Sequence, residues 1–174
     1  MKRHIALVGF MAAGKSTLGK KLARRLDCAF YDLDDLIVKE HGPISDIFYA
    51  QGEKQFRTYE RDELARVVEQ GAPGVIALGG GAVTFDETLQ LLKKRTHRVF
   101  IKVSPEQVLG RLRRSKNVRP LLGPTPSLHK IKELYAARMP KYAHADLVVE
   151  ADDLNTSQVL EHIVEWMHKK NIRL

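Results

Sequence analysis

Short apolar runs alternate with longer amphipathic stretches along this chain, and the two patterns predict different elements. Compact runs of aliphatic and aromatic residues predict buried strands at 4–8, 29–32, 74–78, 97–103 and 146–150. Apolar side chains that recur every three or four residues predict helices at 18–26, 52–70, 85–94 and 159–167, and Pro105 is typical of the first turn of another helix. Strands that alternate with helices predict an α/β protein with a parallel sheet covered on both faces.

One stretch, residues 115–127 (SKNVRPLLGPTPS), follows neither pattern. It contains three prolines and a glycine, and it is long for a connection inside a compact domain. Such loops often close over ligands, so we expect a lid within about 112–127. The chain shows no internal repeat or linker, and 174 residues predict a single domain, 1–174, whose ligands bind at the carboxyl ends of the strands.

Composition narrows the class of protein. Hydrophobic residues make up 44% of the chain, but no apolar run approaches the roughly 20 residues of a membrane span, so we expect no membrane partner. The N-terminal segment lacks the pattern of a signal peptide. Cys28 is the only cysteine, which excludes an internal disulfide and favours a reducing, cytoplasmic setting.

The net charge of +8 suits an anionic partner. A nucleic acid is one candidate, but aromatic residues make up only 7% of the chain and no basic run is interleaved with stacking side chains. We therefore expect an enzyme that handles small anionic molecules and no nucleic-acid partner.

Residues 9–17 (GFMAAGKST) match the phosphate-binding pattern G-x-x-x-x-G-K-[ST] between a predicted strand and a predicted helix, the context that this motif requires. Backbone N–H groups of the loop and of the helix N-terminus would surround the phosphates of ATP. Lys15 would add a positive charge near the β- and γ-phosphates, and Ser16 would offer its hydroxyl to Mg²⁺. The predicted ATP-binding residues of this loop are Gly9, Ala12, Ala13, Gly14, Lys15, Ser16 and Thr17.

A magnesium site usually includes a carboxylate as well. The third predicted strand ends in glycines, whereas the second ends in Asp32 (YDLDDLI). We therefore assign Mg²⁺ to Ser16 and Asp32. Acidic residues also favour the first turn of a helix, and we explain Asp35 in that way and leave it out of the site.

Three consecutive glycines, Gly79, Gly80 and Gly81, follow the third predicted strand (ALGGGAV). Each glycine costs conformational entropy on folding, and a turn from strand to helix needs one or two of them but hardly three. We infer that something approaches the backbone here more closely than a Cβ atom would allow.

The second substrate must be inferred from other residues, since a phosphate loop indicates only a nucleotide. Arg57 stands three residues before Glu60 (GEKQFRTYE), and by itself this spacing favours a surface ion pair worth less than about 1 kcal/mol. Arg119 in the predicted lid and Arg138 just before Pro140 are, taken singly, equally compatible with solvated basic residues.

Taken together, these segments resemble the shikimate kinases over nearly the whole chain. The phosphate loop is common to many families, but FYDLD, GEKQFR, LGGG, VRPLL and RMPKY in that order are far more specific. The chain departs from the family at Ala12, where glycine is frequent, and at Lys141, where leucine is usual. The resemblance implies a three-layer α/β/α fold of the nucleoside monophosphate kinase kind, with a five-stranded parallel sheet in the order 2-3-1-4-5. It also implies Mg²⁺-dependent transfer of the γ-phosphate of ATP to the 3-hydroxyl of shikimate, in the biosynthesis of aromatic amino acids.

The resemblance assigns roles to residues of the acid-binding side. Asp34 would hold the hydroxyls of the substrate ring. Arg57 and Arg138 would clamp its carboxylate, because a planar guanidinium fits a carboxylate with two hydrogen bonds, and Glu60 would orient Arg57. The substrate-binding helices would span about 33–62. The apolar walls of the site would be Phe48, Phe56, Pro120 and Leu121.

The resemblance also assigns the phosphoryl and adenine contacts. Backbone N–H groups of residues 79–81 would face the substrate and the γ-phosphate. Arg119 would close over the transferring group, so that Lys15, Asp34 and Arg119 form the catalytic set. For adenine we choose Arg113 on one side, with Asn155 and Thr156 on the other; Arg111 and Arg114 are also candidates.

Three other functions stay open at this point. A kinase of another small hydroxy acid, such as gluconate, would share the phosphate loop but would not require Arg57, the three glycines and the RPLL motif. An ATP-binding domain without catalysis is disfavoured by four intact residues: Lys15, Ser16, Asp32 and Asp34. A nucleic-acid-binding protein would exploit the net charge. We expect a monomer whose partners are ATP and shikimate.

Overall fold

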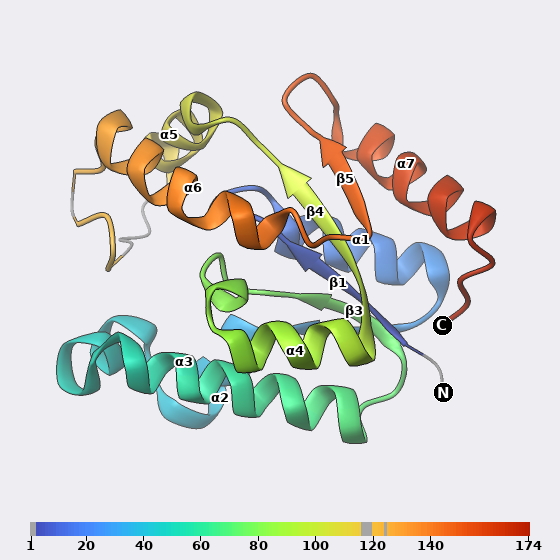
Figure 1. The fold of residues 1–174 in the computed structure, drawn as a ribbon, viewed down its shortest axis with the longest axis horizontal. Coiled ribbons are helices and arrows are strands. Elements are labelled where there is room, and N and C mark those ends of the chain that lie inside the picture. The colour runs from blue at the N-terminus through green and yellow to red at the C-terminus, as the bar shows by residue number, and fades with distance from the viewer. Residues whose placement is uncertain (1–2, 116–119, 124) are drawn as a thin grey trace.

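The computed structural model describes residues 3–115, 120–123 and 125–174. Its strands are β1 (His4–Val8), β2 (Ala29–Asp32), β3 (Gly74–Ala77), β4 (Thr96–Lys102) and β5 (Leu147–Glu150). They form one parallel sheet in the order β2-β3-β1-β4-β5, which confirms the predicted fold class (Figure 1). Each strand begins and ends within one residue of its predicted range.

The helices alternate with the strands and cover both faces of the sheet. Their bounds are α1 (Lys15–Leu26), α2 (Leu33–His41), α3 (Ile44–Gln70), α4 (Asp86–Arg95), α5 (Pro105–Arg114), α6 (Leu128–Tyr142) and α7 (Thr156–Lys169), with a short 3-10 helix η1 (Ala82–Thr84) after β3. From β1 to β2 the chain moves across the sheet in one direction, and at every later crossover it moves in the other. Because such crossovers are right-handed, α1 lies on one face and α2 to α6 lie on the opposite face. The last helix, α7, contacts α1 and completes the first layer.

Two helical segments differ from the prediction. The helix expected at 52–70 is the second part of α3, which begins at Ile44 and kinks at Gly52, where φ is 79° and ψ is 172°. The periodicity also failed to predict α6. Proline normally ends a helix, but Pro140 lies close to the C-terminal end of α6, where the loss of one N–H donor disturbs only the last turn.

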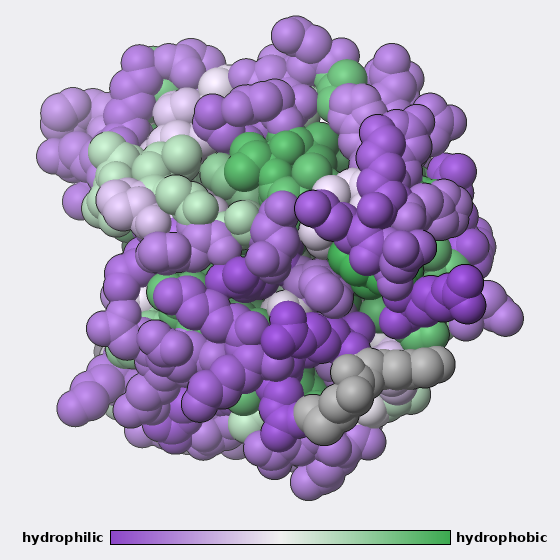
Figure 2. Space-filling view, turned by 45° about the vertical axis from the view of Figure 1, so that its right-hand side comes forward, coloured by the Kyte–Doolittle hydropathy of each residue, from purple (hydrophilic) through white to green (hydrophobic). Residues whose placement is uncertain are grey.

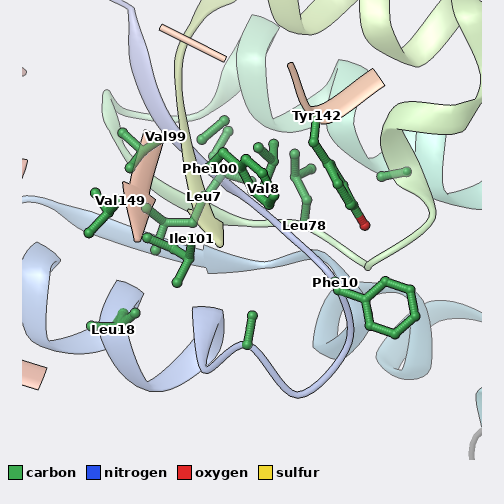
Figure 3. Close-up of a cluster of buried hydrophobic side chains, with 14 of the residues drawn as sticks. Leu7, Val8, Phe10, Leu18, Leu78, Val99, Phe100, Ile101, Tyr142 and Val149 are labelled. Atoms are coloured by element: carbon green, nitrogen blue, oxygen red, sulfur yellow. The ribbon is translucent and has the colours of Figure 1, made fainter. Parts of the chain in front are cut away.

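The main core lies between the central strands and the helices. Every residue of β1 is buried. Figure 3 shows side chains of β1, β4 and β5 packed together, among them Leu7, Val8, Phe100 and Val149, with Tyr142 of α6 at the edge of the cluster. This packing holds the carboxyl ends of β1, β2 and β3 in fixed positions, and the loops of the site begin there.

A second, smaller apolar cluster joins α2 to α3. It consists of Ile37, Ile47 and Phe56, with Phe48 packed against it. Part of the predicted lid is also anchored, because Leu122 is buried against the main core. Arg119, which we assigned to the catalytic set, lies outside the described residues.

The surface is largely polar. On the face drawn in Figure 2, hydrophilic side chains separate the apolar areas from one another. Within the described ranges, none of the helices combines the length and the apolar character that crossing a membrane requires.

Candidate active site

The phosphate loop connects β1 to α1, and its backbone adopts conformations that most residues avoid. A Cβ atom at Gly9, where φ is 150°, would lie 2.6 Å from the carbonyl oxygen of Ile101. Ala12 has a φ of 58°, in the left-handed region that favours glycine. This conformation has a steric cost for alanine that it would not have for glycine.

Lys15 closes the loop from within. Its side chain is buried, and its ammonium group donates hydrogen bonds to the carbonyl oxygens of Gly9 and Phe10, both at 2.8 Å. The structure describes all of α1, and its first turn contains no acidic residue and no side-chain cap. The N-terminus of α1 is therefore electropositive, as binding of a phosphate chain requires.

A cavity of ≈ 180 Å³ opens above this loop. It is lined by Met11, Ala12, Gly14, Lys15, Ser16, Thr17, Asp32, Asp34, Leu78, Gly79 and Gly80. We call it the phosphate cavity. It combines the loop, the lysine and the hydroxyl of Ser16 with two carboxylates, Asp32 at the end of β2 and Asp34 in the first turn of α2. These groups suit a magnesium-bound phosphate chain.

Asp32 has a structural role besides the one we predicted. Its Oδ1 atom accepts hydrogen bonds from the backbone N–H groups of Asp34, at 3.1 Å, and Asp35, at 3.5 Å, so Asp32 is the N-cap of α2. The capping explanation that we gave for Asp35 therefore applies to Asp32 as well. Asp32 still lines the phosphate cavity together with Ser16.

Ser16 and Asp32 on the phosphate cavity fit a Mg²⁺ ion. Among the described residues, no group of three or more His, Cys, Asp or Glu side chains stands close enough together to hold a metal ion. Mg²⁺ does not need such a group, because it is commonly held by one or two carboxylates, phosphate oxygens and water. The hydroxyl of Ser16 and the carboxylate of Asp32, which both line the phosphate cavity, match that pattern.

Arg57 and Glu60 form a buried ion pair, so our interpretation of them as a surface pair was wrong. Nη1 of Arg57 lies 2.7 Å from Oε2 of Glu60, and the two side chains are only 4% and 1% exposed. Helical periodicity predicted the pairing, but it gave no information about burial. Nη2 of Arg57 also lies 3.1 Å from Oε1 of Glu53. Burial raises the pKa of the Glu60 carboxyl, and the guanidinium of Arg57 only partly opposes that shift.

The three glycines make room for the protein's own side chains. A Cβ atom at Gly79 would overlap with Oε1 of Glu60, and one at Gly81 would overlap with Nη2 of Arg57. A Cβ atom at Gly80 would lie 2.9 Å from the backbone nitrogen of Met11 in the phosphate loop. The close approach that we inferred is therefore made by the buried ion pair and by the phosphate loop. Contact of the same glycines with ligands stays a prediction.

Arg138 is a buried cation. It projects from α6, is 3% exposed, and its guanidinium lies 5.3 Å from the centre of the Phe10 ring. Its Nη1 atom has no hydrogen-bond partner among the described residues. Burial lowers the pKa of Arg138, and the positive charge of Arg57 acts in the same direction. An anionic group would satisfy both the charge and the unpaired donor.

A second cavity lies beside the phosphate cavity, and we call it the acid cavity. It has a volume of ≈ 80 Å³ and is lined by Met11, Asp34, Ile44, Phe48, Phe56, Arg57, Gly79, Gly80, Gly81, Pro120, Leu121 and Arg138. The two predicted clamp arginines and all four predicted apolar residues therefore meet in one place. Four residues line both cavities: Met11, Asp34, Gly79 and Gly80.

A third cavity, of ≈ 230 Å³, lies on the other side of the phosphate loop. It shares Gly14 and Thr17 with the phosphate cavity and is also lined by Ala13, Leu18, Arg111, Ala151, Leu154, Thr156 and Val159. We call it the nucleoside cavity. Asn155 does not line it, because its side chain caps α7 by accepting a hydrogen bond from the backbone of Gln158.

Arg111, and not Arg113, is the arginine of the nucleoside cavity. Nη1 of Arg111 donates to the carbonyl oxygen of Ala12 at 3.0 Å, whereas Arg113 is exposed. On α5 the two arginines flank the buried stripe of Val108 and Leu112 on opposite sides, so the sequence pattern gave no means of choosing between them.

Known proteins resemble this chain along most of its length. The family model for shikimate kinase matches residues 11–168. A shikimate kinase of Nitrobacter winogradskyi is 40% identical over 172 residues, which cover 98% of this chain and 79% of that protein. The structure of a shikimate kinase from Acinetobacter baumannii in complex with shikimate has a TM-score of 0.90 at 34% identity and covers 99% of this chain and 97% of that chain. For the shikimate kinase of Aquifex aeolicus, the TM-score is 0.83 at 36% identity, with 97% and 98% of the two chains covered.

Proposed function

This chain belongs to the shikimate kinase family, and we propose that its three cavities bind the nucleoside, the phosphates and the acid in a row. It is an ATP-dependent kinase whose acceptor is shikimate. The observation that carries the proposed site is the boundary between the phosphate cavity and the acid cavity. Because both are lined by Asp34 and the first two glycines, a phosphoryl group on one side would face an acceptor hydroxyl on the other.

The acid cavity orients shikimate through its carboxylate. Arg138 supplies the unpaired N–H donor, and Arg57 supplies a second positive charge. Arg57 already contacts Glu53 and Glu60, so we propose that Arg138 contributes more of the carboxylate affinity. Phe48 and the other apolar residues of this cavity contact the carbon ring, and the backbone of residues 79–81 contacts its polar groups.

Asp34 positions the acceptor. With the carboxylate of shikimate on Arg138, the ring hydroxyls point towards Asp34, and the 3-hydroxyl faces the phosphate cavity. The hydroxyl oxygen attacks the γ-phosphorus, the bond from that phosphorus to the β-γ bridging oxygen breaks, and ADP leaves. Asp34 holds the hydroxyl in line and accepts its proton late in the step, because the transition state of phosphoryl transfer is loose and depends mainly on positioning.

The phosphate loop neutralises the charge that develops on the phosphates. Lys15 and the N-terminus of α1 do this in the phosphate cavity. Ser16 and Asp32 would hold Mg²⁺, whose charge lowers the repulsion between the phosphates and the attacking oxygen. From the family resemblance, we further propose that Arg119 closes over the transferring group as part of the lid.

The nucleoside end of ATP lies against the other side of the loop. We propose that Arg111, rather than Arg113, packs on adenine from α5, with Leu154 and Thr156 opposite. Hydrogen bonding of Arg111 to Ala12 then ties the adenine contact to the phosphate loop itself.

Gluconate is a poorer acceptor in this site. The set of Arg57, Arg138 and the close-packed glycines suits a rigid ring with a carboxylate, and the relatives named above are shikimate kinases. We propose that the chain acts as a cytoplasmic monomer with no nucleic-acid or membrane partner.

ATP consumption measured with shikimate, with gluconate and with no acceptor tests this function. We expect turnover that depends on Mg²⁺ and on shikimate, with little hydrolysis in its absence. Faster turnover of gluconate than of shikimate would contradict the assignment of the acid cavity.

A further inference from the structure

We propose that Tyr142 is a positioning residue for shikimate, because its hydroxyl group ties α6, the helix that carries Arg138, to the glycine loop. Tyr142 lines none of the three cavities, so it cannot touch the substrate there. It acts through Arg138 and Gly80, which do line the acid cavity. This inference rests on the proposed function of that cavity.

The phenol ring of Tyr142 belongs to the hydrophobic core. Its exposed fraction is 1%, and it stacks on Phe100 of β4 with a centroid distance of 4.8 Å and an angle of 24°. Figure 3 shows the ring at the edge of the core cluster, with its oxygen on the side of Phe10. Packing alone would be satisfied by phenylalanine, so the hydroxyl needs a separate explanation.

The hydroxyl connects two elements that are far apart in the sequence. It donates a hydrogen bond to the carbonyl oxygen of Gly80, at 2.5 Å. Arg138 stands one turn earlier on α6, and its Nη1 atom lies close to the same glycine, because a Cβ atom at Gly80 would be 3.3 Å from it. Burial raises the pKa of the Tyr142 hydroxyl well above its usual value, so the group stays neutral and keeps the proton that it donates to Gly80.

This link sets the position of the acid relative to the phosphates. Gly80 lines both cavities and lies against Met11 of the phosphate loop, whereas Arg138 stands on α6. The bond from Tyr142 to Gly80 ties α6 to this loop, so it fixes the separation between the helix that carries Arg138 and the loop beside the γ-phosphate. Phosphoryl transfer depends on the alignment of acceptor and donor, so this separation affects binding and turnover of the acid.

The test compares two variants, Tyr142→Phe and Tyr31→Phe. Tyr31 is a matched control, because its hydroxyl also donates to a backbone carbonyl, that of Ala72 at 3.0 Å, and neither residue lines a cavity described above. For Tyr142→Phe we expect KM for shikimate to rise about tenfold, with KM for ATP changed by less than about twofold. Tyr31→Phe should leave both KM values within about twofold of the wild type.

A double variant separates positioning from general stability. In an Arg138→Lys background, Tyr142→Phe should raise KM for shikimate much less than it does alone, because the hydroxyl acts through the guanidinium. An unchanged KM for shikimate, equal rises in KM for both substrates, or a Tyr142→Phe chain that does not fold at any temperature would each overturn the positioning role. A wild-type protein that does not turn over shikimate would overturn the proposed function as well, whereas the other outcomes affect Tyr142 alone.

Discussion

The guanidinium of Arg57 lies so close to Gly81 that a Cβ atom at residue 81 would overlap with Nη2. The same guanidinium is held by Glu60 at 2.7 Å, in a pair from which water is excluded. Glycine at position 81 therefore leaves room for the ion pair, and Arg57, the cation of that pair, lines the acid cavity.

Replacing Gly81 by alanine should displace Arg57 and weaken the acid site. The displaced guanidinium would leave the buried carboxylate of Glu60 poorly paired, so we expect a loss of about 1–3 kcal/mol in the free energy of unfolding. KM for shikimate should rise far more than KM for ATP. Gly110→Ala is the control, since a Cβ atom there meets open space on α5. Steady-state kinetics and denaturant unfolding measure the two effects, and a Gly81→Ala variant with normal KM for shikimate would refute the close packing.

Arg138→Lys tests the carboxylate clamp while it keeps the positive charge. Lysine cannot reproduce the planar pair of donors, so we expect shikimate affinity to fall about tenfold or more, with ATP affinity retained. Titration calorimetry with each ligand separates the two values. Equal loss of both affinities would indicate a general structural defect at α6 instead.

The two carboxylates at the end of β2 should respond differently to magnesium. Asp32→Asn keeps an oxygen that can cap α2, so the fold should survive, while the Mg²⁺ requirement rises and added metal partly restores activity. Asp34→Asn removes the proton acceptor, and we expect a fall in kcat of about 10²-fold or more that added metal does not restore. Activity is measured against Mg²⁺ concentration for both variants. Identical responses would mean that the two acids act as one metal-binding cluster.

Arg111 and Arg113 form a natural pair of test and control for the adenine site. Arg111→Ala should raise KM for ATP several-fold, because it removes both the stacking surface and the hydrogen bond to Ala12. Arg113→Ala should change KM for ATP by less than about twofold, since that side chain is exposed. Nucleotide titration of both variants decides the matter, and the reverse order of effects would restore our original assignment of Arg113.

The residue pattern alone predicted the strands, the α/β class and the place of the phosphate loop, whereas the strand order came from the family resemblance. Each predicted strand matches the structure within one residue, because strands buried on both faces of a parallel sheet appear as short apolar runs. The phosphate loop could also be predicted from the sequence, because all its groups come from nine consecutive residues, 9–17, between a strand and a helix. We did not predict the helix α6, whose buried face includes the cation Arg138 beside Ile131 and Tyr142 and so lacks a regular apolar stripe.

The remaining features depend on how separate elements pack against one another. Periodicity predicted that Arg57 and Glu60 face each other, but the backbone of residues 79–81 is what buries them. The choice between Arg111 and Arg113 depends on which side of α5 faces the phosphate loop, and the link from Tyr142 to Gly80 spans 62 positions of the sequence. A local pattern places a side chain on one face of its own helix or strand; the partner on that face comes from another part of the chain, and only their packing in three dimensions selects it.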